Sequence, residues 1–517
     1  MDYRGHRISR RARHGTVALV LLIATFGCSS EKDAGGIIFP RAFSIAIDDM
    51  GWNEGSNLSA EGGPYRAGVR RDMDVRDYRP IVEVGREVGV RFQGLFLLAE
   101  MDRENVVATV PTATPAGAGF DNSANMDASQ IETMNYVQDH AAYLEFGLHG
   151  VGHEHWENGQ PTRAEWYDME NDRPWPEEDS RAHMELFKAV MAQYGWTTEN
   201  GQSFPESFVP CAYAYYWNPE GSYSTGKLMR DYGVKYANTD FNSIMESNPP
   251  LEFGGGFDHG LLVVNRYQYG NNWYELAAVP SEPIETFETD IIESHWPNWL
   301  ASDDFLQPAL NQRWIDFFRA VQAERDRYLA KNTEQFSSQW LYFRYTTVEE
   351  ARPGEVAIDN TAMPDEAYQE DFLGNLVLAV VLGEGEHVSE ALLDGESVAA
   401  YLEEAGFGYI YLPPLEQRRY DFTYAVGDET MPAYVNHTGT YNIYTFRTND
   451  EETVIDLKMY GTQELAVKVS AQPRAVRSSN PHLKVLDSTY DDQSGMYSLT
   501  LSGRDMQGER GTVTLTY

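Results

Sequence analysis

The chain has 517 residues and a formal charge of −39, with 79 acidic residues against 40 basic ones. This length indicates two or three domains with hydrophobic cores of their own. Because acidic residues dominate so strongly, nucleic acid is an improbable partner. The acidic residues are spread along the chain, which favours a solvated surface suited to a salty environment over a store of cations.

The first 28 residues have the pattern of an export signal. A basic stretch precedes the apolar run Thr16–Phe26, which is too short to span a bilayer permanently. Cys28 then resembles the lipidated residue of a bacterial lipoprotein; the alternative is an ordinary signal peptide with an incidental cysteine. We therefore expect an exported protein of the bacterial cell envelope, held at the outer membrane or cell surface by a lipid on Cys28, with residues 29–39 as a tether. The second cysteine is Cys211, so a lipidated Cys28 leaves no intramolecular disulfide.

The first predicted strand ends in two carboxylates. Arg41–Ile47 alternates apolar and β-branched residues and is typical of a buried strand, and Asp48 and Asp49 follow it directly. Adjacent carboxylates raise the pKa of one another unless a cation or hydrogen bonds offset their charge. A turn is the alternative interpretation, since aspartate favours turns.

A second buried strand is expected at Leu144–Leu148, and it runs into a histidine cluster. Three of the 12 histidines of the chain lie between positions 149 and 155. His149 and His153 are four residues apart, so on a helical turn their imidazoles point the same way and reach one ion. Surface or capping histidines are the alternative, but carboxylates at the end of another strand favour a metal site.

A strand that ends in Asp-Asp, followed by His-x-x-x-His, resembles the polysaccharide deacetylase family of carbohydrate esterases. The resemblance covers about residues 40–350 and implies an irregular (β/α) barrel with a divalent metal, usually zinc. It also implies that Asp48 is the general base and that Asp49, His149 and His153 bind the metal.

Two further stretches are similar to family motifs. Thr286–Trp299 resembles the last motif, an apolar strand that ends in histidine, which makes His295 the general acid, and Asp240 stands where a supporting aspartate is common. Aromatic residues are dense between the motifs, and we expect Tyr213 and Trp296 to contact the glycan; core packing is the alternative for each of them. The full set is Tyr213, Tyr215, Tyr216, Trp217, Trp273, Trp296 and Trp299.

The stretch Ser207–Tyr213 departs from the motif whose place it takes. The family has an arginine there that orients the general base, and this chain has Val209. Arg70 or Arg71 could substitute from another loop. The loss of the arginine favours an alternative in which the barrel binds glycan without hydrolysing it.

Helical and strand patterns alternate through the first part of the chain, which is typical of a parallel α/β fold with ligands at the carboxyl ends of the strands. We expect helices at Tyr78–Val88, Asp127–Tyr143, Arg181–Tyr194, Ser224–Tyr232 and Trp314–Lys331, and strands at Arg91–Leu98 and Gln339–Thr347.

The C-terminal part has a different pattern. Residues 351–370 are rich in turn-forming residues and are expected to be a linker. Short strand-like runs without a helical period fill residues 371–517 and predict one or two β-sandwich modules.

The predicted function is that of a metal-dependent hydrolase that removes acetyl groups from an N- or O-acetylated polysaccharide or oligosaccharide. The resemblance implies a divalent metal, usually zinc, and a tetrahedral oxyanion that the metal and the backbone N–H of Tyr213 stabilise. The alternatives are the inactive glycan-binding barrel, an envelope lipoprotein that acts through its β modules, and a hydrolase of another bond on the same barrel. The chain has no H-E-x-x-H, G-x-S-x-G or phosphate-loop motif.

Overall fold

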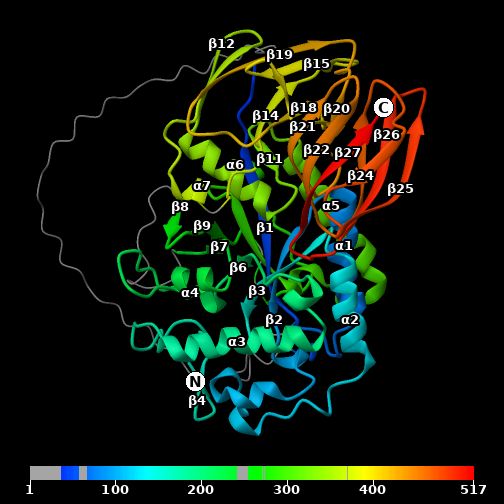
Figure 1. Cartoon of the computed structure of the whole chain (residues 1–517). Coiled ribbons are helices and arrows are strands. Elements are labelled where there is room, and N and C mark those ends of the chain that lie inside the picture. The colour runs from blue at the N-terminus through cyan, green and yellow to red at the C-terminus, as the bar shows by residue number, and fades with distance from the viewer. Residues whose placement is uncertain are drawn as a thin grey trace, which may run out of the picture. The chain divides into compact units, whose positions relative to one another are not determined.

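Seven parallel strands close into a barrel in the computed structural model (Figure 1). The structure describes residues 36–56, 67–162, 164–241, 254–270, 272, 274–369 and 371–517. Around the barrel the strands are β1 (Arg41–Met50), β2 (Phe92–Leu97), β3 (Leu144–Gly150), β6 (Ser207–Phe208), β7 (Tyr236–Thr239), β9 (Leu261–Tyr267) and β10 (Ile291–His295), and β10 returns to β1. Their carboxyl ends all lie at one end of the barrel because every pairing is parallel.

Alternate residues of each strand face two different cores, as the period of two in a β-strand requires. Ile45 and Ile47 of β1 belong to the core under the helices, whereas Ala46 belongs to a core that also contains side chains of the C-terminal sheets. Leu262 and Val264 of β9 belong to the same core as Ala46. The interior of the barrel is therefore continuous with the C-terminal core, and Asp48, two residues after Ala46, lies on the interior side.

Helices cover the outer wall. They are α1 (Val75–Val88), α2 (Ala128–Asp139), α3 (Glu177–Gln193), α4 (Thr225–Asp231) and α5 (Gln307–Gln322). The buried side chains of α6 (Thr333–Tyr345) belong instead to the core that contains side chains of the C-terminal sheets. Asp74 and Asp127 cap α1 and α2 in capping boxes, which explains why these helices begin where they do. No helix among the described residues is both long and apolar enough to cross a membrane.

Three antiparallel sheets follow the barrel. In the seven-stranded sheet a single parallel step, from Tyr401 to Asn436, joins two antiparallel parts, and each part contacts a smaller sheet. The large sheet contains β14 (Leu376–Val381), β18 (Phe407–Leu412), β17 (Ala400–Glu404), β20 (Tyr434–Asn436), β23 (Thr462–Lys468), β26 (Met496–Gly503) and β25 (Leu483–Asp491). The five-stranded sheet contains β12 (Thr347–Arg352), β13 (Glu355–Asp359), β19 (Arg419–Gly427), β15 (His387–Leu393) and β16 (Glu396–Ser397), and the four-stranded sheet contains β21 (Asn442–Thr448), β22 (Glu452–Met459), β27 (Glu509–Thr516) and β24 (Ala475–Ser478).

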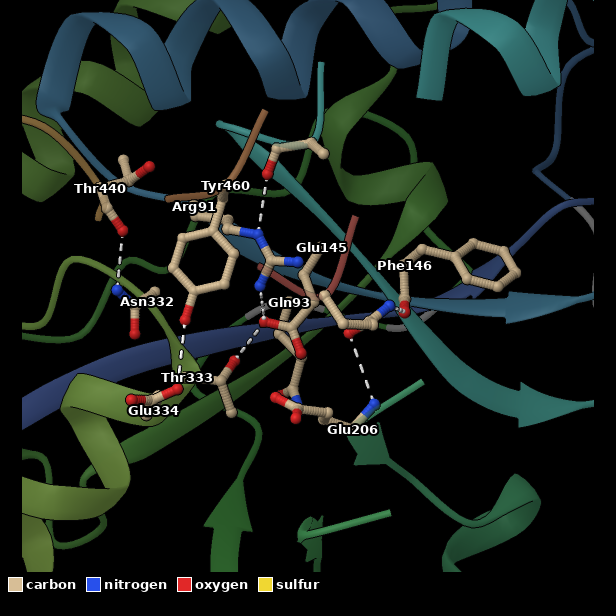
Figure 2. Close-up of polar contacts among 12 residues, drawn as sticks. Arg91, Gln93, Glu145, Phe146, Glu206, Asn332, Thr333, Glu334, Thr440 and Tyr460 are labelled. Atoms are coloured by element: carbon tan, nitrogen blue, oxygen red, sulfur yellow. Dashed lines mark hydrogen bonds and ion pairs between the residues drawn. The ribbon is translucent and has the colours of Figure 1, made fainter. Parts of the chain in front are cut away.

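The C-terminal sheets close the amino end of the barrel with buried polar contacts (Figure 2). The Arg91 guanidinium, at the start of β2, pairs with Glu145 of β3 at 2.7 Å and donates to the carbonyl of Met506 at 2.9 Å. Gln507 donates to the carbonyl of Phe146 at 2.8 Å. Since a buried charge is expensive unless it is paired, these contacts tie the two parts of the chain into one body.

A buried lysine makes a second connection of this kind. Lys458 of β22 lies between Glu206, 2.8 Å away, and Glu334 of α6, 2.9 Å away. Burial by itself would raise the pKa of Glu206, but the ammonium groups of Lys458 and Lys235 lower it to about 2. Figure 2 shows Glu206 and Glu334 together with Tyr460, whose hydroxyl donates to Glu334 at 3.3 Å.

Several boundaries predicted from the sequence are wrong. The segment 351–370 is no linker, because β13 pairs with β19 in the five-stranded sheet. Residues 36–39 are not a loose tether, because Ile38 pairs with Ala379 through two backbone hydrogen bonds. The predicted strand Gln339–Thr347 lies mostly in helix α6, and the predicted helix Trp314–Lys331 ends at Gln322, before the short strand β11 (Arg327–Leu329). Residues 1–28, with the lipidation predicted at Cys28, and residues 29–35 lie outside the described residues.

Candidate metal centre

The candidate side chains meet at the carboxyl end of the barrel. Asp48 and Asp49 end β1, His149 ends β3 and His295 ends β10, with Asp48 and His295 in register across the β1–β10 pair. His153 follows in the loop after β3. All five are buried. Residues separated by up to 247 positions in the chain are thus neighbours because parallel strands end together.

Asp49 and the two histidines face one another. Asp49 Oδ1 lies 3.2 Å from His149 Nε2 and 3.7 Å from His153 Nε2. Asp49 is only 3% exposed, and its Oδ1 accepts no hydrogen bond from the described residues. A buried carboxylate oxygen in this position suits a cation, because two imidazoles and one carboxylate are a common ligand set for a divalent metal with open positions.

Contacts outside the centre fix which ring nitrogen each histidine presents to Asp49. His149 Nδ1 lies 2.8 Å from the carbonyl of Val209, and His153 Nδ1 lies 2.9 Å from Glu154 Oε1. Both contacts turn Nε2 toward Asp49, as the outer partners of metal-binding histidines do. The expectation of a helical turn is wrong: His149 is in a strand, and His153 has a left-handed backbone with φ of 70°.

Glu165 holds the histidine loop in this shape. Its carboxylate accepts backbone N–H groups of Val151, Gly152 and His153 at 2.8 to 3.1 Å, and its Oε1 lies 2.8 Å from His183 Nδ1. Burial would raise the pKa of Glu165, but His183 and the backbone N–H groups lower it. The charged Glu165 carboxylate therefore holds the turn at residues 151–153 through its backbone N–H groups.

Asp48 is paired with an arginine that the sequence analysis missed. Arg266 of β9, 0% exposed, donates to Asp48 Oδ1 at 2.9 Å and also to Oδ2. Burial would raise the pKa of Asp48, but the Arg266 guanidinium holds it below the usual value. The suggestion of Arg70 or Arg71 is wrong: Arg70 is exposed, and Arg71 pairs with Asp77 at 2.6 Å.

His295 lies close to both aspartates. Its Nε2 lies 4.0 Å from Asp48 Oδ2 and 3.9 Å from Asp49 Oδ2, and its Nδ1 lies 3.6 Å from Glu293 Oε1. The Tyr213 hydroxyl donates to Glu293 Oε1 at 2.5 Å. Burial raises the pKa of Glu293 above its usual value. The carboxylate beside His295 is thus Glu293 of the same strand. Asp240, predicted as a supporting aspartate, is buried directly after β7.

The charges at the centre leave room for a cation. Asp48 and Glu293 lie beside the guanidinium of Arg266, and Asp49 lies beside His295. Carboxylates in excess over cations are unfavourable inside a protein unless a further positive charge joins them. The ligand atoms of Asp48, Glu293 and His295 lie within 4.8 Å of one another, and so do those of His149, His153 and Cys211. These buried groups could hold a metal ion.

Three of the seven aromatic residues expected in a glycan cleft are core residues. Trp296 is fully buried, and its indole N–H donates to the carbonyl of Asp77 at 3.2 Å, so its prediction as a substrate contact is wrong. Trp299 is buried against Trp314, and Tyr215 is also buried. Tyr216 and Trp217 are half-buried, and Trp273 lies outside the described residues.

Tyr213 is half-buried at the edge of the centre, but its backbone N–H donates to the carbonyl of Pro210 at 3.2 Å. This N–H is therefore not the free oxyanion donor that we expected. A cleft of about 1170 Å³ lies elsewhere on the barrel, next to β9 and α6. The residues that line it include Tyr267, Trp340 and Phe343.

Searches of the chain against protein-family models, curated proteins and solved structures find no match.

Proposed function

We propose that the protein is a metal-dependent hydrolase that removes acetyl groups from an N- or O-acetylated polysaccharide or oligosaccharide. One observation carries the proposal. Asp49, His149 and His153 converge at the carboxyl end of a closed parallel barrel, and the neighbouring pair Asp48 and His295 lies next to Asp49. The same residues carry the resemblance to the polysaccharide deacetylase barrel.

The donor set supports a borderline divalent ion, and we propose zinc. When bound by Asp49, His149 and His153, such an ion supplies a Lewis acid that polarises the acetyl carbonyl and makes water more acidic. The charge of the neighbouring Arg266 keeps Asp48 ionised, so this carboxylate is ready to accept the proton of the attacking water. The bidentate contact also fixes the direction in which Asp48 presents its oxygens.

His295 is the proposed general acid. Once water has added to the acetyl carbon, the bond from that carbon to the sugar nitrogen or oxygen breaks, and the leaving group takes a proton from His295. Glu293, 3.6 Å from His295 Nδ1, stabilises the protonated ring and is itself held by Tyr213. The products are acetate and a free amine or hydroxyl group on the sugar.

A barrel that binds glycan without hydrolysing it is the competing proposal. Its support was the arginine missing from Ser207–Tyr213. Arg266 now provides a guanidinium on Asp48 from a different strand, which removes that argument. Export and lipidation at Cys28 remain predictions from the sequence.

The test is acetate release by the purified full chain from a panel of acetylated glycans, combined with metal analysis. We expect about one tightly bound divalent ion per chain. Asp48→Asn should abolish most acetate release and retain the ion. Stoichiometric metal without acetate release from any glycan would favour the binding protein.

A further inference from the structure

Cys211 brings a thiol to the same two histidines. The residue is 0% exposed, and its ligand atom lies within 4.8 Å of those of both His149 and His153. Its Sγ donates to the carbonyl of His149 at 3.3 Å. Gly150 permits this approach, since a Cβ there would lie 3.1 Å from Sγ and 2.3 Å from Glu165 Oε2.

Simple core packing does not account for the surroundings of this thiol. A buried cysteine usually packs as a small hydrophobic residue. Here the buried Asp49 Oδ1, which accepts no hydrogen bond from the described residues, faces the same two imidazoles. The two residues after Cys211, Ala212 and Tyr213, have left-handed backbones with φ of 54° and 60°. Non-glycine residues in this region are strained and cluster at functional sites.

We propose that Cys211 is a fourth protein ligand of the ion, together with Asp49, His149 and His153. This inference rests on the metal centre of the proposed function and extends its ligand set. In a tetrahedral zinc site, bond lengths near 2.0–2.3 Å place the ligand atoms roughly 3.3–3.8 Å apart. The distances of 3.2 and 3.7 Å from Asp49 to the two histidines fit that arrangement, and the ligand atom of Cys211 lies within 4.8 Å of a ligand atom of each histidine.

A thiolate changes which ions the centre selects. Sulfur ligands favour zinc, cobalt and cadmium over magnesium, calcium and manganese, which prefer oxygen. The thiol loses its proton to solvent when the sulfur–metal bond forms, because the thiolate is the ligand. Four protein ligands fill a tetrahedral sphere, so the substrate needs a fifth position, which zinc accepts.

Cobalt(II) provides the test, since a thiolate on cobalt gives a charge-transfer absorption in the near ultraviolet that nitrogen and oxygen ligands do not give. The full chain is loaded with cobalt and compared with Cys28→Ser and Cys211→Ser. We expect the near-ultraviolet band in the wild type and in Cys28→Ser, and its loss in Cys211→Ser. Zinc affinity, measured by competition with a chelator, should fall at least about tenfold in Cys211→Ser, since even outer-shell changes weaken binding by about 10- to 100-fold.

The outcomes separate this inference from the proposed function. Visible cobalt bands in the wild type without the near-ultraviolet band would overturn the role of Cys211 and leave the Asp49–His149–His153 site intact. A wild type that binds no cobalt would overturn both. The comparison of the wild type with Cys28→Ser decides the matter even if the Cys211 variant does not fold.

Discussion

The Arg266–Asp48 pair offers the sharpest test of the centre, because it is the contact that the sequence motifs did not contain. The change is Arg266→Met, which keeps much of the length of the side chain and removes the guanidinium. Arg266 is 0% exposed and holds both oxygens of Asp48, and its Nε lies 3.6 Å from Glu293. The variant therefore leaves two buried carboxylates without their shared cation.

Removing one partner of a buried pair destabilises a protein by about 3–5 kcal/mol, because the remaining charge stays buried and uncompensated. The matched control is Arg319→Met. Arg319 and Glu87 approach to 2.5 Å as well, but their side chains are 53% and 52% exposed. Such a surface pair contributes about 0–1 kcal/mol. The two variants thus differ in burial and hardly in contact distance.

Urea denaturation followed by circular dichroism measures the stability difference, and acetate release measures the function. Arg266→Met should unfold at a clearly lower urea concentration than Arg319→Met, and it should lose about 10²–10⁴-fold in kcat/KM because the general base is no longer oriented. Arg266→Lys should recover part of the stability, since it restores the charge but not the two parallel hydrogen bonds. Equal midpoints for the two methionine variants, or full activity in Arg266→Met, would refute the reasoning.

Four further results are expected. Asp48→Asn should reduce acetate release by about 10²–10⁴-fold while metal content is unchanged, and His149→Ala should lose the stoichiometric metal; metal retained in His149→Ala would contradict the ligand assignment. Glu206 has a pKa of about 2 in the fold, so its contribution to stability is complete above about pH 4.5 and disappears as the pH falls toward 2. Glu206→Gln should remove about 1–3 kcal/mol at neutral pH and flatten the acid side of the stability profile in urea titrations from pH 2 to 7. A chain without residues 371–517 should not form a soluble barrel, because it lacks Lys458 and the C-terminal part of the shared core; a soluble truncated chain with native near-ultraviolet dichroism would contradict this.

The local sequence pattern was sufficient to predict the two strands that carry Asp48, Asp49 and His149. Arg41–Ile47 and Leu144–Leu148 are apolar runs that end in ligand-type residues, and both are barrel strands. The same rule, applied to Leu261–Val264, would have led to Arg266. The period of two along β10 would have placed Glu293 on the same side as His295.

Other errors arose because the composition of a stretch does not show which distant segments pair with it or cover it. Residues 355–359 lie in the turn-rich segment and yet form strand β13, because β19, far along the chain, supplies the partner strand. Trp296 is as suitable for a sugar as any tryptophan, but α1 covers it and accepts its N–H. Burial by a distant element carries no local signature.

Residue type and spacing along one strand or loop were enough to predict the apolar strands, the Asp-Asp pair and the two histidines. The folded chain was needed to see that Arg266 rather than Arg70 or Arg71 pairs with Asp48, that Cys211 lies beside the histidines, and that the C-terminal sheets close the barrel. These contacts escape local patterns because a closed parallel barrel makes neighbours of strand ends from distant parts of the chain. The energy of burying their charges depends on that arrangement and not on sequence order.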